Sequence, residues 1–281
     1  MSPVWQEKKR KWINKLVIIV AWLITLLGMS LPLWIIATVI SRGFNSFNLA
    51  LFTQNTPPPQ AMGGLKNAII GSLEMVGLAT LIATPIAVVT GIYLAEYGKH
   101  DKTASVIRFV NDVLLSAPSI VIGLFVYVLL VVPLRHFSGW AGALSLAIIA
   151  LPIVVRTSEN MLHLVPDNLR EGAYALGATR RQTILMICVP AARNGIVTGV
   201  LLSVARISGE TAPLLFTALN NQFYSMNLNQ PMANLPVVIF QFAMSPYDNW
   251  QSLAWAGAAL ISVSVVIINI SARSLFRRNA S

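Results

Sequence analysis

The sequence predicts an all-α integral membrane protein with six transmembrane helices, and three observations carry that prediction. Of the 281 residues, 56% are hydrophobic and only 11% are charged, whereas a soluble domain carries about 25% charged residues. Predominantly apolar stretches long enough to cross a bilayer, about 20 residues each, recur along the chain. Backbone groups in lipid must bond within their own segment, so each stretch is expected to be helical. The composition excludes a single water-soluble core.

The six predicted spans cover residues 13–40, 67–94, 106–133, 139–155, 187–219 and 253–272. The first follows a basic run at residues 8–11 and in that respect resembles a secretory signal. Its apolar run is much longer than the ~7–15 residues of a signal core, however. We therefore expect a retained first transmembrane helix.

The distribution of the 20 Lys and Arg residues predicts the orientation of the spans. Most of them flank the inner ends if both termini lie in the cytoplasm, as the positive-inside rule requires. This gives a cytoplasmic tail (1–12), an outer loop (41–66), a core (67–272) and a second cytoplasmic tail (273–281). The net charge of +10, which in a soluble protein would suggest nucleic acid, is here explained by contact with the bilayer, and no nucleic-acid partner is expected.

One outer segment of the core, about residues 220–251, is rich in Asn and Gln. It contains a short apolar piece, 235–244, that is too short to span a bilayer. We expect this piece to form an interfacial helix. It either caps the bundle or provides a docking surface for a partner outside.

The inner loop between spans four and five, about residues 156–186, contains a predicted helix that begins at Asp167 as the N-cap. Leu169, Ala173 and Leu176 then fall at i, i+4 and i+7 and form one apolar stripe. Gly177 follows the last of these residues and is expected to be the C′ glycine that ends the helix.

A second helix is predicted directly after that glycine. Thr179 and Gln182 have the spacing of a capping box, so the loop is expected to form helix, glycine joint and helix. Helical physics alone leaves two roles open. The unit either lies against the inner surface of the bundle or inserts into a groove on another protein.

Seven positions of this loop resemble the EAA loop of ABC importer permeases, whose consensus is Glu-Ala-Ala, three residues, Gly, nine residues, Ile, one residue, Leu-Pro. They are Glu171, Gly172, Ala173, Gly177, Ile187, Val189 and Pro190. Gly172 replaces the first Ala of that consensus and Val189 replaces Leu. The resemblance implies a type I ABC importer permease bundle, with this segment as the coupling helix that docks on an ATPase subunit.

The chain has no Gly-x-x-x-x-Gly-Lys-Ser/Thr phosphate-binding loop. ATP and Mg are therefore expected in the partner ATPase, and no enzymatic activity or cofactor is expected in this chain. Cys188 alone cannot form an internal disulfide or a metal site and is expected to be a packing residue.

The fifth span carries two charged residues, Arg206 and Glu210, at i and i+4. A charge at mid-bilayer costs about 2.5–3.5 kcal/mol on insertion scales, so it calls for an explanation. Pro213 cannot donate to the carbonyl of Gly209, which predicts a bend there, and Gly209 is expected to admit a close backbone contact. The charges form either a structural ion pair or a path in which the arginine fork binds an oxyanion. Glu74 in span two is a further candidate.

Residues 205–219 resemble the phosphate-specific, PstA-type branch of the importer permeases, as do residues 151–161 and 165–171. The resemblance implies a subunit of the bacterial inner membrane that forms half of the path of an inorganic phosphate importer. Its implied partners are a sister permease of PstC type in a heterodimer, an ATPase subunit dimer and a periplasmic phosphate-binding protein. Arg206 and Glu210 match charged positions associated with the phosphate path. The alternatives are a permease for sulfate, molybdate or phosphonate, and an ion-gradient-driven anion transporter.

Overall fold

The computed structural model describes residues 3–99 and 101–277, and every regular element within these residues is a helix. The end of the predicted C-terminal tail, residues 278–281, lies outside the described residues. Five helices are long and apolar enough to cross a membrane, and a bent pair of helices supplies a sixth candidate span. The predicted all-helical fold is confirmed.

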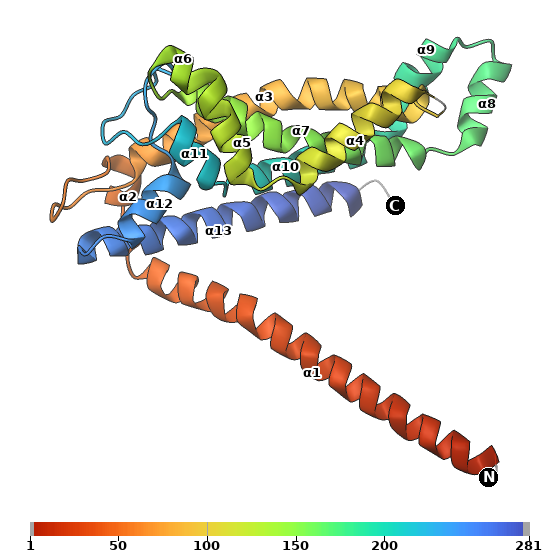
Figure 1. Cartoon of the computed structure of the whole chain (residues 1–281), viewed down its shortest axis with the longest axis horizontal. Helices are drawn as coiled ribbons and strands as arrows, with labels where there is room; N and C mark the ends of the chain where they lie inside the picture. The colour runs from red at the N-terminus through yellow and green to blue at the C-terminus, as the bar shows by residue number, and fades with distance from the viewer. Residues whose placement is uncertain (1–2, 100, 278–281) are drawn as a thin grey trace.

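The five long apolar helices form most of the molecule. They are α1 (Pro3–Phe44), α3 (Lys66–Glu96), α7 (Gly139–His163), α10 (Val189–Ile207) and α13 (Asp248–Arg277). The short elements are α2 (Ala50–Thr53), α8 (Asp167–Ala175), α9 (Arg180–Thr183), α11 (Ala212–Thr217) and α12 (Leu235–Ala243). Figure 1 shows α8 and α9 at one end of the bundle, called here the α8 end, and α12 near the opposite end.

The third predicted span, residues 106–133, is not one continuous helix. It is divided into α4 (Lys102–Ser116) and α5 (Ser119–Val126), which continues through a π-turn (Tyr127–Val131) into α6 (Val132–Leu134). The helix axis bends by 106° between α4 and the arm formed by Ser119–Leu134. Ala117 adopts an extended backbone because the ring of Pro118 disfavours helical geometry in the residue before it.

The fifth predicted span, residues 187–219, also needs correction at both ends. At its start, the second helix of the inner loop is α9, which runs without a break through a π-turn (Ile184–Cys188) into α10. Pro190 has no N–H for the carbonyl of Met186, and its ring crowds that carbonyl, which explains the widened turn. At its end, α10 stops at Ile207 and α11 is a separate helix.

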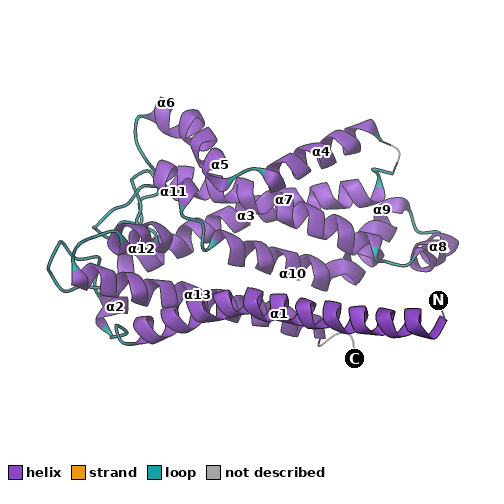
Figure 2. Ribbon diagram, turned by 60° about the horizontal axis from the view of Figure 1, so that its bottom comes forward, coloured by secondary structure: helices purple, strands orange, loops and turns teal. Residues whose placement is uncertain are grey.

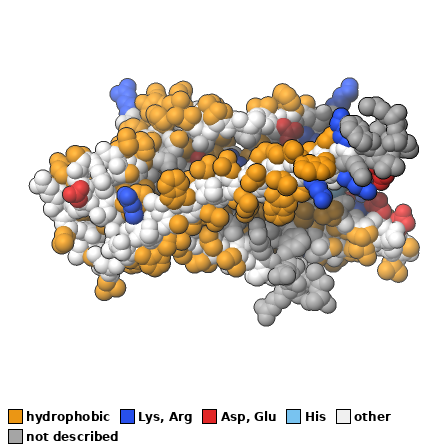
Figure 3. Space-filling view, turned by 90° about the horizontal axis from the view of Figure 1, so that it is seen from below, with side chains coloured by type: hydrophobic (Ala, Val, Ile, Leu, Met, Phe, Trp, Pro, Cys, Tyr) orange, Lys and Arg blue, Asp and Glu red, His pale blue; other side chains and the backbone are white. Residues whose placement is uncertain are grey.

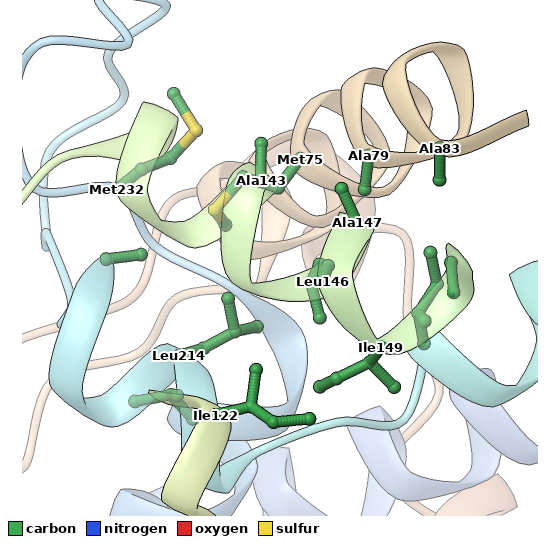
Figure 4. Packing of buried hydrophobic residues seen from close by; sticks show 14 residues of the cluster. Met75, Ala79, Ala83, Ile122, Ala143, Leu146, Ala147, Ile149, Leu214 and Met232 are labelled. Atoms are coloured by element: carbon green, nitrogen blue, oxygen red, sulfur yellow. The ribbon is translucent and has the colours of Figure 1, made fainter. Parts of the chain in front are cut away.

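The core is formed where α3 packs against α7 through small side chains. Ala79 and Ala83 of α3 face Ala143 and Ala147 of α7, and all four are buried (Figure 4). Small residues let membrane helices approach closely and gain van der Waals contact. This pair of helices provides the frame on which the broken spans are mounted.

The predicted interfacial helix at residues 235–244 is present as α12, which packs against α3 and α13. The amide of Leu235 donates to Ser72 Oγ on α3 at 2.8 Å. Nearby, the Asn67 side chain donates to Thr56 Oγ1 at 2.9 Å and to the carbonyl of Asn221 at 2.8 Å. These bonds tie the two long loops at this end to α3.

Helix α1, which contains the predicted first span, extends away from the rest of the bundle (Figure 1). It packs on α13, where the Arg42 guanidinium lies 5.1 Å from the centre of the Trp255 ring. The described start of α1 and the described end of α13 lie toward the α8 end (Figures 1 and 2). On the face drawn in Figure 3, hydrophobic side chains cover most of the length, and charged side chains gather mainly at that end.

Candidate functional site

Arg206 and Glu210 lie where the fifth span breaks. Arg206 is in the last turn of α10, and Glu210 is in the non-helical residues before α11. The i, i+4 spacing predicted that the two residues share one helix face, and this prediction is wrong because the helix ends between them. Gly209 is a poor helix former, and Pro213 cannot donate to its carbonyl, so the expected bend becomes a complete interruption. Pro213 instead occupies the first turn of α11, where no donor is needed.

The Arg206–Glu210 ion pair is loose. Arg206 Nε lies 3.9 Å from Glu210 Oε1, and the Arg206 side chain is 50% exposed while that of Glu210 is 16% exposed. A guanidinium has five donors, and this contact is too long to be a hydrogen bond. Arg206 therefore has donors available for another acceptor.

The second broken span lies beside this arginine. Arg206 lines a small cavity at the bend between α4 and α5, with Leu114, Leu115, Ala117, Ser119, Ile122, Ile149 and Pro152. The two broken spans are also in contact, because a Cβ added to Gly123 of α5 would lie 2.5 Å from Pro213 Cα. Irregular backbone at membrane depth is tolerated where protein buries it or where it lines a cavity. The arrangement places a cation between two interrupted helices.

The predicted close backbone contact at Gly209 is wrong. Among the described residues, the one atom within 4 Å of a Cβ built there is the carbonyl oxygen of Arg206, at 3.9 Å, and it belongs to the same turn as Gly209. Within the described residues, Gly123 makes the close approach instead. The sequence did not single out Gly123, because a glycine in an apolar run carries no signal of what packs on it.

Glu74 lies on α3, and its two carboxylate oxygens are buried without a hydrogen-bond partner among the described residues. Within those residues it forms no ion pair with Arg206 within 4 Å, so the structure does not bring these two predicted site residues together. A buried polar group without a partner costs several kcal/mol in an apolar environment. Its position therefore calls for a role other than neutralising Arg206 in this conformation.

At the α8 end, the coupling unit has the predicted shape with one change. Asp167 is the first helical residue of α8 and not its N-cap, which is Pro166. Its carboxylate instead contacts Arg170 Nη1 at 3.1 Å. Gly177 has φ +80°, as a C′ glycine requires. Thr179 and Gln182 form the predicted capping box.

The apolar stripe of α8 is divided between the bundle and the surface. Ala173 is buried, whereas Leu169 and Leu176 are exposed, Leu176 to 90%. Of the remaining residues that match the EAA loop, Glu171, Gly172 and Pro190 are exposed and Ile187 is half-buried. Cys188 is fully buried with Leu162, Val165 and Ala192. The exposed leucines favour insertion into a groove on a partner.

Two long-range ion pairs at this end were missed by the sequence analysis. In the first, Arg108 Nε on α4 lies 2.7 Å from Glu159 Oε1 on α7, and His163 Nε2 lies 3.8 Å from the same oxygen. Arg108 also donates to the carbonyls of Leu94 and Gly98 at 2.8 and 3.3 Å. The buried Glu159 near the end of a predicted span was a signal, but its partner is 51 residues away in sequence.

The second pair joins Arg170 of α8 to Glu96 of α3, with Nη2 and Oε1 2.9 Å apart. Glu96, the last residue of α3, is therefore a largely buried partner of the coupling helix. The hydrogen bond to Glu96 holds the pKa of Arg170 above its usual range. Arg170 is thus fixed as a cation.

Known proteins give this arrangement a family. The family described as binding-protein-dependent transport system inner membrane component matches residues 87–281. "Phosphate transport system permease protein PstA" of Haemophilus influenzae is 58% identical over 268 residues, which cover 95% of each chain. The protein of the same name from Yersinia pestis is 52% identical and covers 97% of this chain and 94% of its own. The chain belongs to the PstA permease family.

Distant solved structures support the PstA fold. A chain of the MetNI methionine ABC transporter in an inward-facing conformation is 18% identical, with a TM-score of 0.64 over 75% of this chain and 94% of that one. A chain of a bacterial ABC transporter that imports alginate is 15% identical, with a TM-score of 0.62 over the whole of both chains. At these identities the likeness shows the permease fold, so the substrate must be argued from close relatives and from the site.

Proposed function

We propose that this chain is the permease subunit that forms half of the path of an ATP-driven inorganic phosphate importer. The carrying observation is the position of Arg206 between two interrupted spans, with donors not used by Glu210. The planar guanidinium fork matches two oxygens of a phosphate. PstA relatives named as phosphate permeases, up to 58% identical over nearly the full length, support phosphate over other oxyanions.

The chain needs partners to work in this way. A sister permease of PstC type supplies the other half of the path, and a periplasmic phosphate-binding protein delivers the anion. An ATPase subunit dimer binds ATP and Mg and receives the exposed leucines of α8. This chain then carries no covalent chemistry. Its contribution is to change which side of the membrane has access to Arg206.

The proposed orientation places the α8 end in the cytoplasm of a bacterial cell and the chain in the inner membrane. The described start of α1 and the described end of α13 lie toward that end (Figure 1), in agreement with the positive-inside distribution of Lys and Arg. Glu210 then competes with phosphate for Arg206 and releases the anion. Glu74 is a second acidic group of the path that we expect to change its surroundings when the bundle changes state.

Uptake of labelled phosphate tests the proposal. It is measured at low external phosphate in cells that lack this chain and carry either the unaltered chain or Arg206→Gln, with and without excess sulfate, molybdate or phosphonate. Membrane levels of both proteins are compared. We expect the unaltered chain to restore phosphate uptake that these anions do not inhibit. We expect Arg206→Gln to insert normally and to transport phosphate at least tenfold more slowly, which corresponds to about 1.4 kcal/mol of activation free energy.

Three other outcomes would each reject part of the proposal. Strong inhibition by another oxyanion would reject phosphate as the preferred substrate. Uptake that persists when the ATPase subunit is inactivated would favour an ion-gradient-driven anion transporter. Normal transport by Arg206→Gln would make Arg206 a structural charge.

A further inference from the structure

The Arg170 guanidinium holds together three helices at the α8 end. From its own position on α8 it donates through Nη2 to Glu96 Oε1 on α3 and to the carbonyl of Leu162 on α7, both at 2.9 Å. Nη1 donates to the carbonyl of Val165 at 2.5 Å and to Asp167 Oδ1 at 3.1 Å. The side chains of Arg170 and Glu96 are only 17% and 9% exposed.

This arrangement uses properties that arginine has and lysine lacks. The guanidinium presents donors in a rigid plane and can serve several acceptors at fixed angles. The last carbonyls of a helix have no partner within the helix and carry partial negative charge, so a cation there is stabilising. Arg170 therefore caps the end of α7 and neutralises Glu96 with one group.

Apolar packing provides little connection between α8 and α3. A cavity of about 440 Å³ at this end is lined by residues of both helices, among them Glu96, Lys99, Asp167, Arg170 and Tyr174. Ala173 is the buried residue of α8, and α8 packs against the π-turn (Ile184–Cys188) that leads into α10. Movement of α8 can thus reach the fifth span by packing, but it reaches α3 across a cavity that the Arg170–Glu96 pair bridges directly. Arg180 of α9 adds an indirect contact, since it donates to the carbonyl of Glu96 and lies over the Tyr97 ring.

We propose that Arg170 is the positioning residue that transmits movement of the coupling helix to α3 and α7. The inference rests on the proposed function, since it assigns a route from the ATPase contact to the path. Movement of α8 displaces Arg170, which displaces Glu96 at the end of α3 and the last turn of α7. Those two helices form the frame that carries Glu74 and the core. The hydrogen bonds, and not the charge alone, provide the stiffness of this connection.

The full complex reconstituted in proteoliposomes tests this role. Phosphate uptake and ATP hydrolysis are measured in the same sample for Arg170→Gln, Arg170→Lys, Glu96→Gln and the double variant Arg170→Gln/Glu96→Gln. Lys102→Gln is the matched control, because it removes one exposed cation from the first turn of α4. Among the described residues, the Lys102 side chain has no ion-pair partner.

We expect Arg170→Gln to assemble and hydrolyse ATP while phosphate moved per ATP falls about tenfold, within the range of about 5- to 150-fold typical of coupling between sites. The phosphate moved per ATP by Arg170→Lys is expected to lie between the values of the unaltered complex and Arg170→Gln, because lysine keeps the charge but not the planar fork. The double variant should be no worse than Arg170→Gln, because both changes break one link. Lys102→Gln should match the unaltered complex.

Three results would overturn the proposal. The first is an unchanged ratio of phosphate moved to ATP hydrolysed in Arg170→Gln. The second is a loss of uptake that only follows the amount of assembled complex. The third is a fold-loss of that ratio in the double variant equal to the product of the fold-losses in Arg170→Gln and Glu96→Gln.

A second readout separates this inference from the identity of the substrate. Nitroxide labels on cysteines that replace Leu81 of α3 and Val266 of α13, in a Cys188→Ala background, report ATP-driven movement of α3 whatever anion is carried. If the unaltered complex moves no phosphate, the proposed function fails. Loss of the ATP-driven distance change in Arg170→Gln would still support the route, and its retention would overturn it.

Discussion

Two glycines of α3 predict opposite effects of the same substitution. A Cβ at Gly91 would lie 2.5 Å from Ser158 Cβ and 3.1 Å from the carbonyl oxygen of Val155, both on α7. A Cβ at Gly77 would meet nothing within 4 Å. The pair therefore tests whether the close packing of α3 on α7 holds the bundle together.

The expected free energies follow from these distances. Alanine in place of glycine within a helix stabilises by about 0.5–1 kcal/mol. Overpacking a tight contact costs about 1–3 kcal/mol, and at Gly91 the neighbours are a Cβ and a backbone carbonyl that cannot turn aside. Gly77→Ala should therefore be stabilised by up to about 1 kcal/mol, and Gly91→Ala destabilised by about 1–2 kcal/mol, from the balance of these effects.

The assay is unfolding of the purified chain in detergent micelles by added SDS, followed by tryptophan fluorescence, with all variants under identical conditions. Gly91→Ala should unfold at a lower SDS fraction than the unaltered chain, and Gly77→Ala at the same or a higher fraction. Equal midpoints for the two variants would refute the packing argument, because only the surroundings of the two sites differ.

Substitutions at three further sites, Arg108, Gly177 and Asp101, have expected outcomes at the α8 end. Arg108→Gln leaves Glu159 buried without its cation and should lower the free energy of unfolding by about 3 kcal/mol in the same assay. The double variant Arg108→Gln/Glu159→Gln should be less destabilised than Arg108→Gln. A loss in the double variant equal to the sum of the losses in Arg108→Gln and Glu159→Gln would contradict this. Gly177→Ala forces alanine to φ +80° at a cost of about 1–2 kcal/mol and should reduce phosphate uptake. Gly77→Ala, with nothing near its Cβ, should leave uptake unchanged. Asp101→Ala removes the N-cap of α4 and should lower the stability of the chain at neutral pH.

The Asp101 effect should also depend on pH. The Tyr93 hydroxyl and then the Thr103 amide, both donating to the carboxylate, hold the pKa of Asp101 below its ordinary value of 3.8. A lowered pKa in the folded chain contributes stability above the ordinary pKa and loses it as pH falls through the folded value. The difference between Asp101→Ala and the unaltered chain should therefore narrow below about pH 4, and a constant difference would contradict the assignment.

Local patterns predicted the elements that depend on neighbouring residues. The apolar runs gave the long helices, and the glycine at Gly177 and the Thr179–Gln182 spacing gave the coupling unit, because capping and turn chemistry act within a few residues. Pro213 was expected to bend the fifth span, and the structure has a complete break there. The break before Pro118 in the third span was not predicted. A proline shows where a helix is weak but not whether packing will hold its two arms together.

Contacts between distant segments could not be predicted in the same way. Glu96 and Arg170 are 74 residues apart, and nothing in either local sequence names the other. The loose Arg206–Glu210 pair was also beyond a periodicity argument, because the i, i+4 rule applies only if the helix continues.

The central claim is that Arg206 lines an anion path that opens to one side at a time. The most direct test is labelling of Arg206→Cys, in a Cys188→Ala background, by an anionic thiol reagent that does not cross membranes. The full complex in proteoliposomes is labelled with and without ATP, and with and without phosphate. The account predicts modification that depends on ATP and that phosphate does not slow, because the guanidinium that binds phosphate is absent from this variant. An assembled complex in which Arg206→Cys resists the reagent from both sides, in every state, would contradict it.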